Sequence, residues 1–379
     1  MASLAVGYSN LDDLVMVISW AETNFRGRAE QASIDLELFG RTTYEGKYFV
    51  PYVDSRGSSI SIRAYDTERN RRFIGGTSVS TANDVFDERR TGLELRYTVP
   101  SSKHVRMRYG FRSEEVSSSY LQGTRSIGGG ILEPIGDGSS SGGSWSRETG
   151  NDELDEGRDT FNPGDLTDNP GPGDTAGPIV VAAPLHPGGR LASFTVGRTS
   201  DTRDLINNPT KGHYTDFGLE YAGSILGGET DFQKLTAEHR IYRKINDEGD
   251  VLAARLKIGT SFGDLPLFES FSVGGADTLR GYEDDRFRGE SMALLNFEYR
   301  KAFGDKLTLV GFVDIGSAFG GQFKTVVPGF TIPADEDSLT PHIGAGAGLR
   351  VVTPIGPIRL DFGFGDEGSE AHFSFGHTF

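Results

Sequence analysis

The chain has 379 residues, no cysteine, 52 glycines and a formal net charge of −16 at neutral pH. The lack of cysteine excludes a disulfide framework and a thiolate metal site, and the acidic balance argues against nucleic-acid binding, which needs basic patches. The mean hydropathy of −0.36 excludes a helical membrane protein but fits a membrane barrel, in which only every second strand residue must be apolar.

The N-terminal sequence MASLAVGYSNLDDLVMVISW has neither the basic start nor the continuous apolar core of a signal peptide. No apolar run in the chain approaches the roughly 20 residues that a spanning helix needs. An exported barrel must carry a signal peptide, so we expect the chain to be a fragment with a new Met1.

Segments of alternating apolar and polar residues recur along the chain, separated by turn residues, and they predict β-strands. We expect sixteen strands, and an even number is what bacterial single-chain barrels have. The predicted strands are 3–9, 14–25, 28–39, 43–53, 58–69, 89–99, 104–116, 190–200, 213–223, 231–244, 250–262, 291–303, 306–318, 341–353, 356–364 and 370–379.

The predicted connections alternate between short and long. The short ones are typical of periplasmic turns, as at 54–57, 100–103, 246–249, 304–305 and 354–355. The long ones are typical of extracellular loops, as at 70–88, 117–189, 263–290 and 319–340. A membrane barrel places the two kinds at opposite ends, whereas a soluble sandwich has no reason to separate them.

Each predicted strand near the C-terminus has one apolar face and one charged face. In 291–303, Phe297 and Tyr299 share a face, whereas Glu298 and Arg300 share the other. The phase alone does not say which face points outward. The aromatic strand ends, the strand number and the loop asymmetry favour an apolar outer face, so the sequence predicts an all-β, 16-stranded antiparallel transmembrane barrel over 1–379.

The longest predicted loop, 117–189, is acidic and rich in Gly, Ser, Pro and Asp. Such a composition cannot bury enough apolar surface to offset its ordering entropy, which predicts a mobile extracellular loop. A calcium site is an alternative interpretation, although the spacing fits no EF-hand. Its ligands would be Asp152, Asp155, Asp159 and Asp165. A domain linker is a further alternative, but alternating strands on both sides favour one barrel.

The segment SVGGADTLRGY at 272–282 carries an arginine in a glycine-flanked tip. Glycines permit positive φ angles and a close approach to a wall. The predicted tip residues are Gly274, Gly275, Leu279, Arg280, Gly281 and Tyr282. The next two strands each place a carboxylate where Arg280 could reach it, at Glu298 and at Asp314.

These elements together resemble the Omp85 superfamily of outer-membrane barrels, whose sixth long loop carries an Arg-Gly-aromatic tip folded back into the lumen. The run FVDIG from Phe312 to Gly316 resembles the family's Phe-x-Asp-x-Gly element, and Glu298 resembles its strand glutamate. The resemblance implies that loop 263–290 enters the lumen and that Arg280 pairs with Asp314 and Glu298. A guanidinium can bind a carboxylate in bidentate fashion, and its role would be positional rather than catalytic.

The C-terminal sequence EAHFSFGHTF is typical of the last strand of an outer-membrane barrel, which assembly machinery recognises by strand addition. The alternating residues are Phe373, Phe375, His377 and Phe379, of which His377 departs from the usual aromatic or aliphatic residue. The first strand carries a glycine near its middle and the last strand contains Gly376. Glycine weakens a strand, so we expect a weak seam that can open laterally and template an incoming strand.

The family resemblance implies an assembly barrel in a bacterial-type outer membrane that folds and inserts β-barrel proteins. Its partners would be outer-membrane lipid, unfolded outer-membrane proteins and, in the full-length system, periplasmic POTRA domains and accessory lipoproteins. We expect no POTRA domain within residues 1–379, because the predicted strands begin at about residue 3. One alternative is an exporter of the TamA or two-partner-secretion type. Another is a passive porin, against which the lumen-filling tip argues.

We expect no enzymatic activity, no cofactor, no metal and no nucleic-acid partner. The seven histidines form no His-x-x-x-His pattern, and no Gly-x-Ser-x-Gly elbow accompanies them. An outer-membrane lipase that uses Ser and His is an alternative, but any charged barrel contains stray residues of both types.

Overall fold

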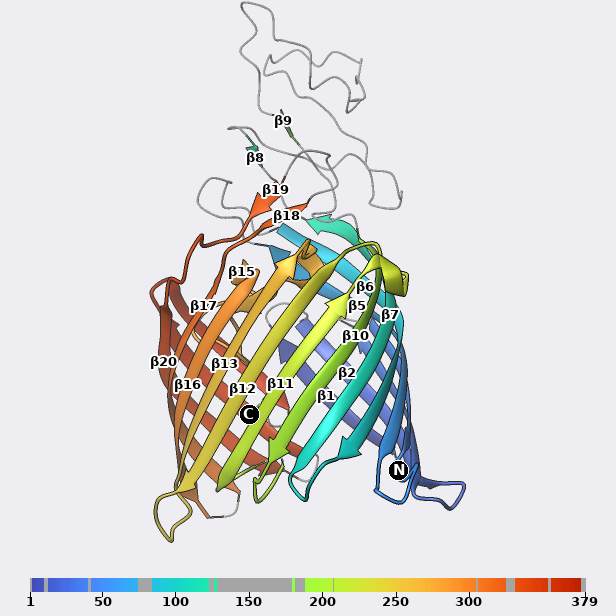
Figure 1. The fold of residues 1–379 in the computed structure, drawn as a ribbon. Helices are drawn as coiled ribbons and strands as arrows, with labels where there is room; N and C mark the ends of the chain where they lie inside the picture. Colours follow the sequence, from blue (N-terminus) through green and yellow to red (C-terminus); the bar gives the residue numbers. More distant parts are fainter. Residues whose placement is uncertain are drawn as a thin grey trace, which may run out of the picture.

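The computed structural model describes residues 2–9, 13–39, 42–73, 84–122, 126–127, 179–180, 188–206, 208–304, 306–324, 331–353 and 356–375. Sixteen strands form one sheet in which each strand pairs with its neighbour along the chain. The strands are tilted and the sheet curves into a barrel (Figure 1). The predicted all-β, 16-stranded antiparallel barrel is therefore confirmed. None of the described helices is long and apolar enough to cross a membrane.

The barrel strands follow chain order and pair antiparallel at every step. They are β1 Ala2–Ser9, β2 Asp13–Phe25, β3 Glu30–Phe39, β4 Thr42–Val50, β5 Ser59–Phe73, β6 Asp84–Pro100, β7 Val105–Gln122, β10 Gly189–Asp201, β11 Gly212–Ala222, β12 Phe232–Lys244, β13 Val251–Gly263, β16 Ser291–Phe303, β17 Leu307–Phe319, β20 His342–Thr353, β21 Gly356–Gly365 and β22 Gly368–Phe375.

Three strands extend well into the predicted loops 70–88 and 117–189, which corrects the bounds of these loops. β5 runs to Phe73, β6 starts at Asp84 and β7 ends at Gln122. Apolar residues are adjacent in these extensions rather than alternating, as in Val85 with Phe86 and Tyr120 with Leu121, so the strand pattern is hard to recognise. Arg69 lies opposite Glu88 where the extension of β6 begins, and a pair of opposite charge stabilises a ladder.

The long connections also contain short elements that the sequence did not predict. Segment 263–290 holds the 3-10 helix η3 and the paired strands β14 and β15, and the described residues of the other connections hold two further strand pairs and one 3-10 helix. These elements are η2 Ser224–Leu226, η3 Leu267–Glu269, β8 Ser126–Ile127, β9 Ile179–Val180, β14 Phe271–Val273, β15 Phe287–Gly289, β18 Gln322–Lys324 and β19 Thr331–Pro333. The four aspartates of the alternative calcium site lie outside the described residues.

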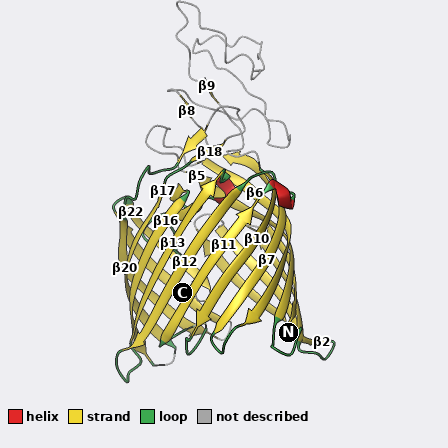
Figure 2. Cartoon of the chain, in the orientation of Figure 1, coloured by secondary structure: helices red, strands yellow, loops and turns green. Residues whose placement is uncertain are grey.

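The two strand faces have opposite character, and burial settles which one points outward. Phe297 and Phe362 are 46% and 52% exposed, whereas Glu298 and Asp361, one residue away on the same strands, are buried. The apolar face is therefore the outer face and the charged face lines the lumen, as in a membrane barrel. Short turns lie at one end of the barrel and the longer connections at the other (Figure 2).

The first and last strands meet differently from the others. β1 and β22 lie next to each other, yet among the described residues no ladder of paired residues joins them. The hydrogen-bonded order therefore begins at β1 and ends at β22, and their meeting line is called the seam below.

Candidate functional site

The tip of segment 263–290 is a tight turn that presents Arg280 to the lumen wall. Gly274 and Gly275 have φ angles of +138° and +91°, which L-residues rarely adopt. The Thr278 hydroxyl bridges the turn, because it accepts from the Gly274 N–H at 2.8 Å and donates to the Gly274 carbonyl at 2.7 Å. The Gly275 N–H donates to the Tyr282 carbonyl at 3.2 Å and closes the other side.

Arg280 binds Asp314 of β17 through two parallel hydrogen bonds. Its Nε donates to Asp314 Oδ2 at 2.6 Å and its Nη2 donates to Oδ1 at 2.8 Å. The Arg280 backbone N–H donates to the same carboxylate at 3.2 Å. A planar guanidinium matches a carboxylate in this way, so both the side chain and the backbone of the tip are fixed to β17.

Two further carboxylates and an aromatic ring complete the Arg280 site. Arg280 Nη1 donates to Glu298 Oε1 of β16 at 2.7 Å and to Asp361 Oδ2 of β21 at 3.3 Å. The Phe312 ring lies against the guanidinium, with its centroid 3.6 Å from Cζ. We call Arg280 with Glu298, Asp314 and Asp361 the Arg280 clamp. Arg280 is 1% exposed, so these interactions are weakly screened.

Wall arginines surround the same carboxylates. Glu298 accepts from Arg300 Nε at 2.8 Å and from Arg350 Nη2 at 3.0 Å, and Asp361 accepts from Arg359 Nε at 2.6 Å. The wall carboxylates thus have partners besides Arg280. The Arg280 clamp and these wall arginines form one connected network of ion pairs across β16, β17, β20 and β21.

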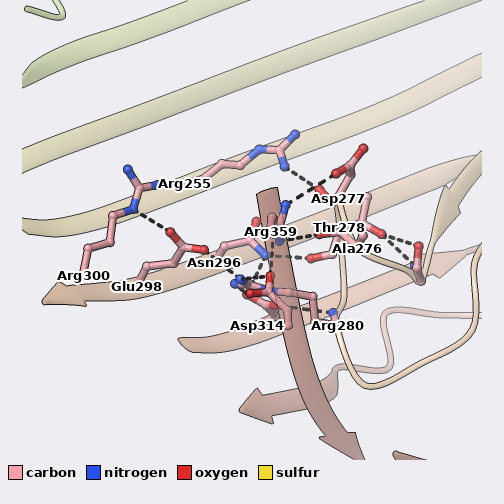
Figure 3. A network of polar contacts seen from close by, with 12 residues as sticks. Arg255, Ala276, Asp277, Thr278, Arg280, Asn296, Glu298, Arg300, Asp314 and Arg359 are labelled. Carbon is pink, nitrogen blue, oxygen red and sulfur yellow. Dashed lines mark hydrogen bonds and ion pairs between the residues drawn. The ribbon is translucent and has the colours of Figure 1, made fainter. Parts of the chain in front are cut away.

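Wall side chains also hold the backbone of the tip at three consecutive residues. Arg359 Nη2 donates to the Ala276 carbonyl at 2.9 Å, Arg255 Nη1 donates to the Asp277 carbonyl at 2.8 Å, and Asn296 Nδ2 donates to the Thr278 carbonyl at 2.7 Å. Figure 3 shows these three donors converging on the tip from different strands. The path of the tip is therefore fixed independently of the Arg280 side chain.

Glycines let the tip touch the wall backbone. Gly281 has a φ of +96°, and a Cβ there would lie 2.8 Å from the Phe364 carbonyl carbon. A Cβ on Gly363 would lie 2.4 Å from the Gly281 nitrogen, and one on Gly316 would lie 2.7 Å from a methyl of Val273. No side chain fits at these positions without movement of the backbone or of a packed neighbour.

Tyr282 fastens the far side of the tip. Its hydroxyl lies 2.5 Å from Asp366 Oδ1 and 3.1 Å from the Ile343 carbonyl, and it is placed to donate to either. Burial and the bond to Asp366 raise the pKa of Tyr282 to about 12. The phenol therefore remains protonated and a donor at physiological pH.

The structure brings most of the predicted site residues together. The tip residues lie against the strands that carry Glu298, Phe312, Asp314 and Gly316, and Leu279 is fully buried beside Val273. Phe373 lies in β22 and Phe375 ends it, whereas His377 and Phe379 lie outside the described residues. The third carboxylate, Asp361, was not among the predicted site residues. Its place on the charged face of strand 356–364 was the signal that could have identified it.

No group of three or more His, Cys, Asp or Glu side chains in the described part of the chain is arranged to hold a metal ion. The carboxylates of the Arg280 clamp accept hydrogen bonds from guanidiniums. The arrangement can hold a loop in place, and it presents no nucleophile paired with a base.

The barrel has an apolar outer face, and segment 263–290 with the buried Arg280 clamp occupies its lumen. These two features are typical of an outer-membrane β-barrel in which a loop occupies the lumen. The family comparison agrees with this class. The chain matches the model of the Omp85 superfamily domain over residues 24–379 and belongs to that superfamily.

Curated relatives match part of the chain. The outer membrane protein assembly factor BamA of Nitratidesulfovibrio vulgaris is 32% identical over 192 residues, which cover 45% of this chain and 23% of that protein. The chloroplastic outer envelope protein 80 of Oryza sativa subsp. japonica is 31% identical over 167 residues, which cover 42% of this chain and 24% of that protein. The chain thus covers about a quarter of the length of these relatives.

Solved structures share the fold across nearly the whole chain. BamA from Haemophilus ducreyi lacking POTRA domains 1-3 superposes with a TM-score of 0.65 at 13% identity, covering 99% of this chain and 68% of that one. CdiB from Escherichia coli superposes with a TM-score of 0.61 at 12% identity, covering 99% of this chain and 61% of that one. At such identities the likeness establishes the fold alone.

Proposed function

We propose that the chain is the barrel of a BamA-type assembly factor, which folds β-barrel proteins and inserts them into a bacterial-type outer membrane. The observation that carries this proposal is the seam between β1 and β22, which has no ladder among the described residues of an otherwise continuous sheet. Parting of the seam exposes unpaired backbone groups, and such an edge templates an incoming strand. Because a lipid-exposed edge must be paired, opening is coupled to the arrival of substrate.

The proposed function implies protein substrates, a lipid environment and periplasmic partners. The substrates are unfolded outer-membrane proteins, and outer-membrane lipid surrounds the apolar outer face. In the full-length protein, POTRA domains and accessory lipoproteins on the periplasmic side deliver the substrates. The barrel does no covalent chemistry and uses no cofactor, because positioning and strand pairing account for the proposed activity.

A second candidate is a dedicated exporter, because membership of the Omp85 superfamily does not by itself separate the two roles. The partial match to BamA of Nitratidesulfovibrio vulgaris, at 32% identity, favours the assembly factor. A passive porin is disfavoured because the tip occupies lumen space that diffusing solutes need.

Depletion of the full-length gene product in its own cells, followed by quantitative proteomics of the outer membrane, separates the candidates. We expect most barrel proteins to fall together. Loss of one secreted protein or a narrow group would instead identify a dedicated exporter. An unchanged protein profile with altered solute uptake would instead favour the interpretation as a passive porin.

The seam has its own test, helped by a chain that has no cysteine of its own. A cysteine pair across β1 and β22 forms a disulfide that locks the seam, and the same pair under reducing conditions is the control. We expect assembly to stop when the disulfide forms and to resume on reduction. Assembly that continues in the oxidised protein would contradict a laterally opening seam.

A further inference from the structure

A second ion cluster holds the same loop at a different place. Glu269 ends η3, eleven residues before Arg280, and is 6% exposed. Its Oε1 lies 2.8 Å from Arg90 Nη1 and 3.2 Å from Arg112 Nη1, and its Oε2 lies 3.3 Å from Lys234 Nζ. We call Glu269 with Arg90, Arg112 and Lys234 the Glu269 clamp.

The cations of the Glu269 clamp also bind the backbone and the aromatic rings beside Glu269. Lys234 Nζ donates to the Glu269 carbonyl at 2.8 Å, and Arg90 Nη2 donates to the Phe268 carbonyl. Lys234 Nζ lies 4.7 Å from the centroid of the Phe271 ring, and Arg90 Cζ lies 5.6 Å from that of Phe268. Both distances allow cation–π attraction. The sequence Phe-Glu-Ser-Phe thus meets the wall through charge, backbone and ring together.

The two clamps grip different walls of the barrel. Arg90, Arg112 and Lys234 stand on β6, β7 and β12, whereas the partners of Arg280 stand on β16, β17 and β21. In the strand order of the sixteen-stranded sheet, the three cations stand on the sixth, seventh and tenth strands, and the three carboxylates stand on the twelfth, thirteenth and fifteenth. The strands β12 and β16 are two steps apart, whereas β6 and β17 are seven steps apart. Segment 263–290 therefore contacts two separate stretches of the lumen wall.

The wall arginines have other ion partners, whereas the charge of Glu269 is compensated by the wall cations. Arg90 also pairs with Glu88 at 2.7 Å, and Arg112 also pairs with Glu220 at 2.7 Å. Burial raises the pKa of Glu269, but the charges of Arg112, Lys234 and Arg90 outweigh it and hold the pKa well below its usual range. The buried carboxylate is therefore ionised, and it would lack compensation without these cations.

A polar cavity of about 540 Å³ borders η3 on the side of β5, β6 and β7. Its lining includes Arg63, Arg96, Arg108, Phe268 and Glu269. Atoms beside a cavity lack packing partners on that side. The rest of η3 is packed, since Leu267 and Phe268 are buried in an apolar cluster with Leu191 and Phe232. The ion contacts of Glu269 therefore add restraint on the side of η3 that borders the cavity.

We propose that Glu269 is a second anchor of the lumen loop, a positioning residue that ties η3 to the wall formed by β6, β7 and β12. Segment 263–290 is then fastened to two separate stretches of the wall by clusters of opposite polarity. A loop cation enters wall carboxylates at one end, and a loop carboxylate enters wall cations at the other. The anchor acts on the position of the loop and stands whether or not the proposed function is correct.

Hydrogen exchange of the purified barrel in lipid nanodiscs tests the anchor without any substrate. In Glu269→Gln we expect the amides of 265–273 to exchange at least about tenfold faster, because a buried ion cluster has lost its central charge. The amides of 276–284 should keep their rates, since the Arg280 clamp is intact. Asp264→Asn is the matched control, because Asp264 is 67% exposed and pairs with an exposed Lys324. It should change neither segment.

A second variant keeps the test decisive if Glu269→Gln does not fold. Lys234→Met keeps much of the side-chain stem but removes one of the three cations, so we expect a smaller acceleration confined to 265–273. Unchanged exchange in this segment in the variants that fold would overturn the proposal. Equal acceleration over the whole of 264–284 would also overturn it, because the loop would then be held as one unit by general stability rather than by two anchors.

Discussion

The Arg280 clamp and the Glu269 clamp hold one loop by opposite means. Arg280 is a loop cation among wall carboxylates, set where Gly281 touches the backbone of β21. Glu269 is a loop carboxylate among wall cations, set beside an open cavity. At the first clamp the loop backbone touches the wall backbone at Gly281, whereas at the second Leu267 and Phe268 pack in an apolar cluster beside the ions.

The comparison teaches where each clamp is vulnerable. In both, one loop charge faces several wall charges that have other partners, such as Arg350 for Glu298 and Glu220 for Arg112. Removing the loop charge breaks all of the ion pairs of a clamp at once. Removing one wall group leaves the loop charge with its remaining partners, so substitutions on the loop should cost more than those on the wall.

The largest expected effect is that of Arg280→Ala. The change leaves Asp314, Glu298 and Asp361 without their shared cation in a buried site, so we expect the free energy of unfolding to fall by about 3–5 kcal/mol. Denaturant unfolding of the barrel in detergent micelles measures it.

Arg286→Ala is the control for this change, because Arg286 is a loop arginine whose partner Glu367 is partly exposed. An exposed pair contributes below about 1 kcal/mol. Equal losses in the two variants would mean that burial of the Arg280 clamp confers no special stability.

Gly281→Ala tests the close packing that distinguishes the Arg280 clamp. The new Cβ would lie 2.8–3.0 Å from the backbone of Phe364 and Gly365, at a φ of +96°. We expect a loss of about 2–4 kcal/mol from strain and overpacking. Gly304→Ala is the control, because Gly304 has a φ of +65° but nothing within 4 Å of its Cβ position. A loss as large in the control would assign the effect to backbone conformation alone.

The sequence predicts the Arg280 clamp better than the Glu269 clamp for a physical reason. Glycines beside an arginine leave a visible pattern, because a tip that touches backbone tolerates no side chain at positions such as Gly281. The partners Glu298 and Asp314 stand in the next two strands, on a charged face that alternation reveals. Asp361 has the same alternation signal but stands 81 residues from Arg280, where sequence proximity gives no guide.

The Glu269 clamp could not be derived in this way. Arg90 and Arg112 lie 179 and 157 residues from Glu269 along the chain, and all three look like ordinary charged residues in sequence. Their meeting depends on the curvature of the barrel and on the path of η3. The same limit explains the strand ends, because β5 and β6 extend through residues whose partners, such as Phe86 opposite Arg71, are known only from the register of the sheet.

A smaller effect is expected from Tyr282→Phe, which removes the hydroxyl that donates to Asp366 or to the Ile343 carbonyl at the edge of the Arg280 clamp. Because Asp366 is largely exposed and can bind water instead, we expect a loss of only about 1 kcal/mol in the free energy of unfolding. Tyr52→Phe, at an exposed tyrosine, should leave stability unchanged. A loss of several kcal/mol for Tyr282→Phe would mean that this hydroxyl, rather than the buried ions, dominates the tip.

The smallest expected effect is the coupling between the clamps, and it decides whether they are two anchors or one. The described contacts of Arg280 and Glu269 share no ion partner and involve different walls. Energies of such separate sites add to within about 0.5 kcal/mol. In a double-mutant cycle of Arg280→Lys and Glu269→Gln, the loss in the double variant should therefore equal the sum of the single losses. A coupling above about 1 kcal/mol would contradict independence, because release of one end would then also loosen the other.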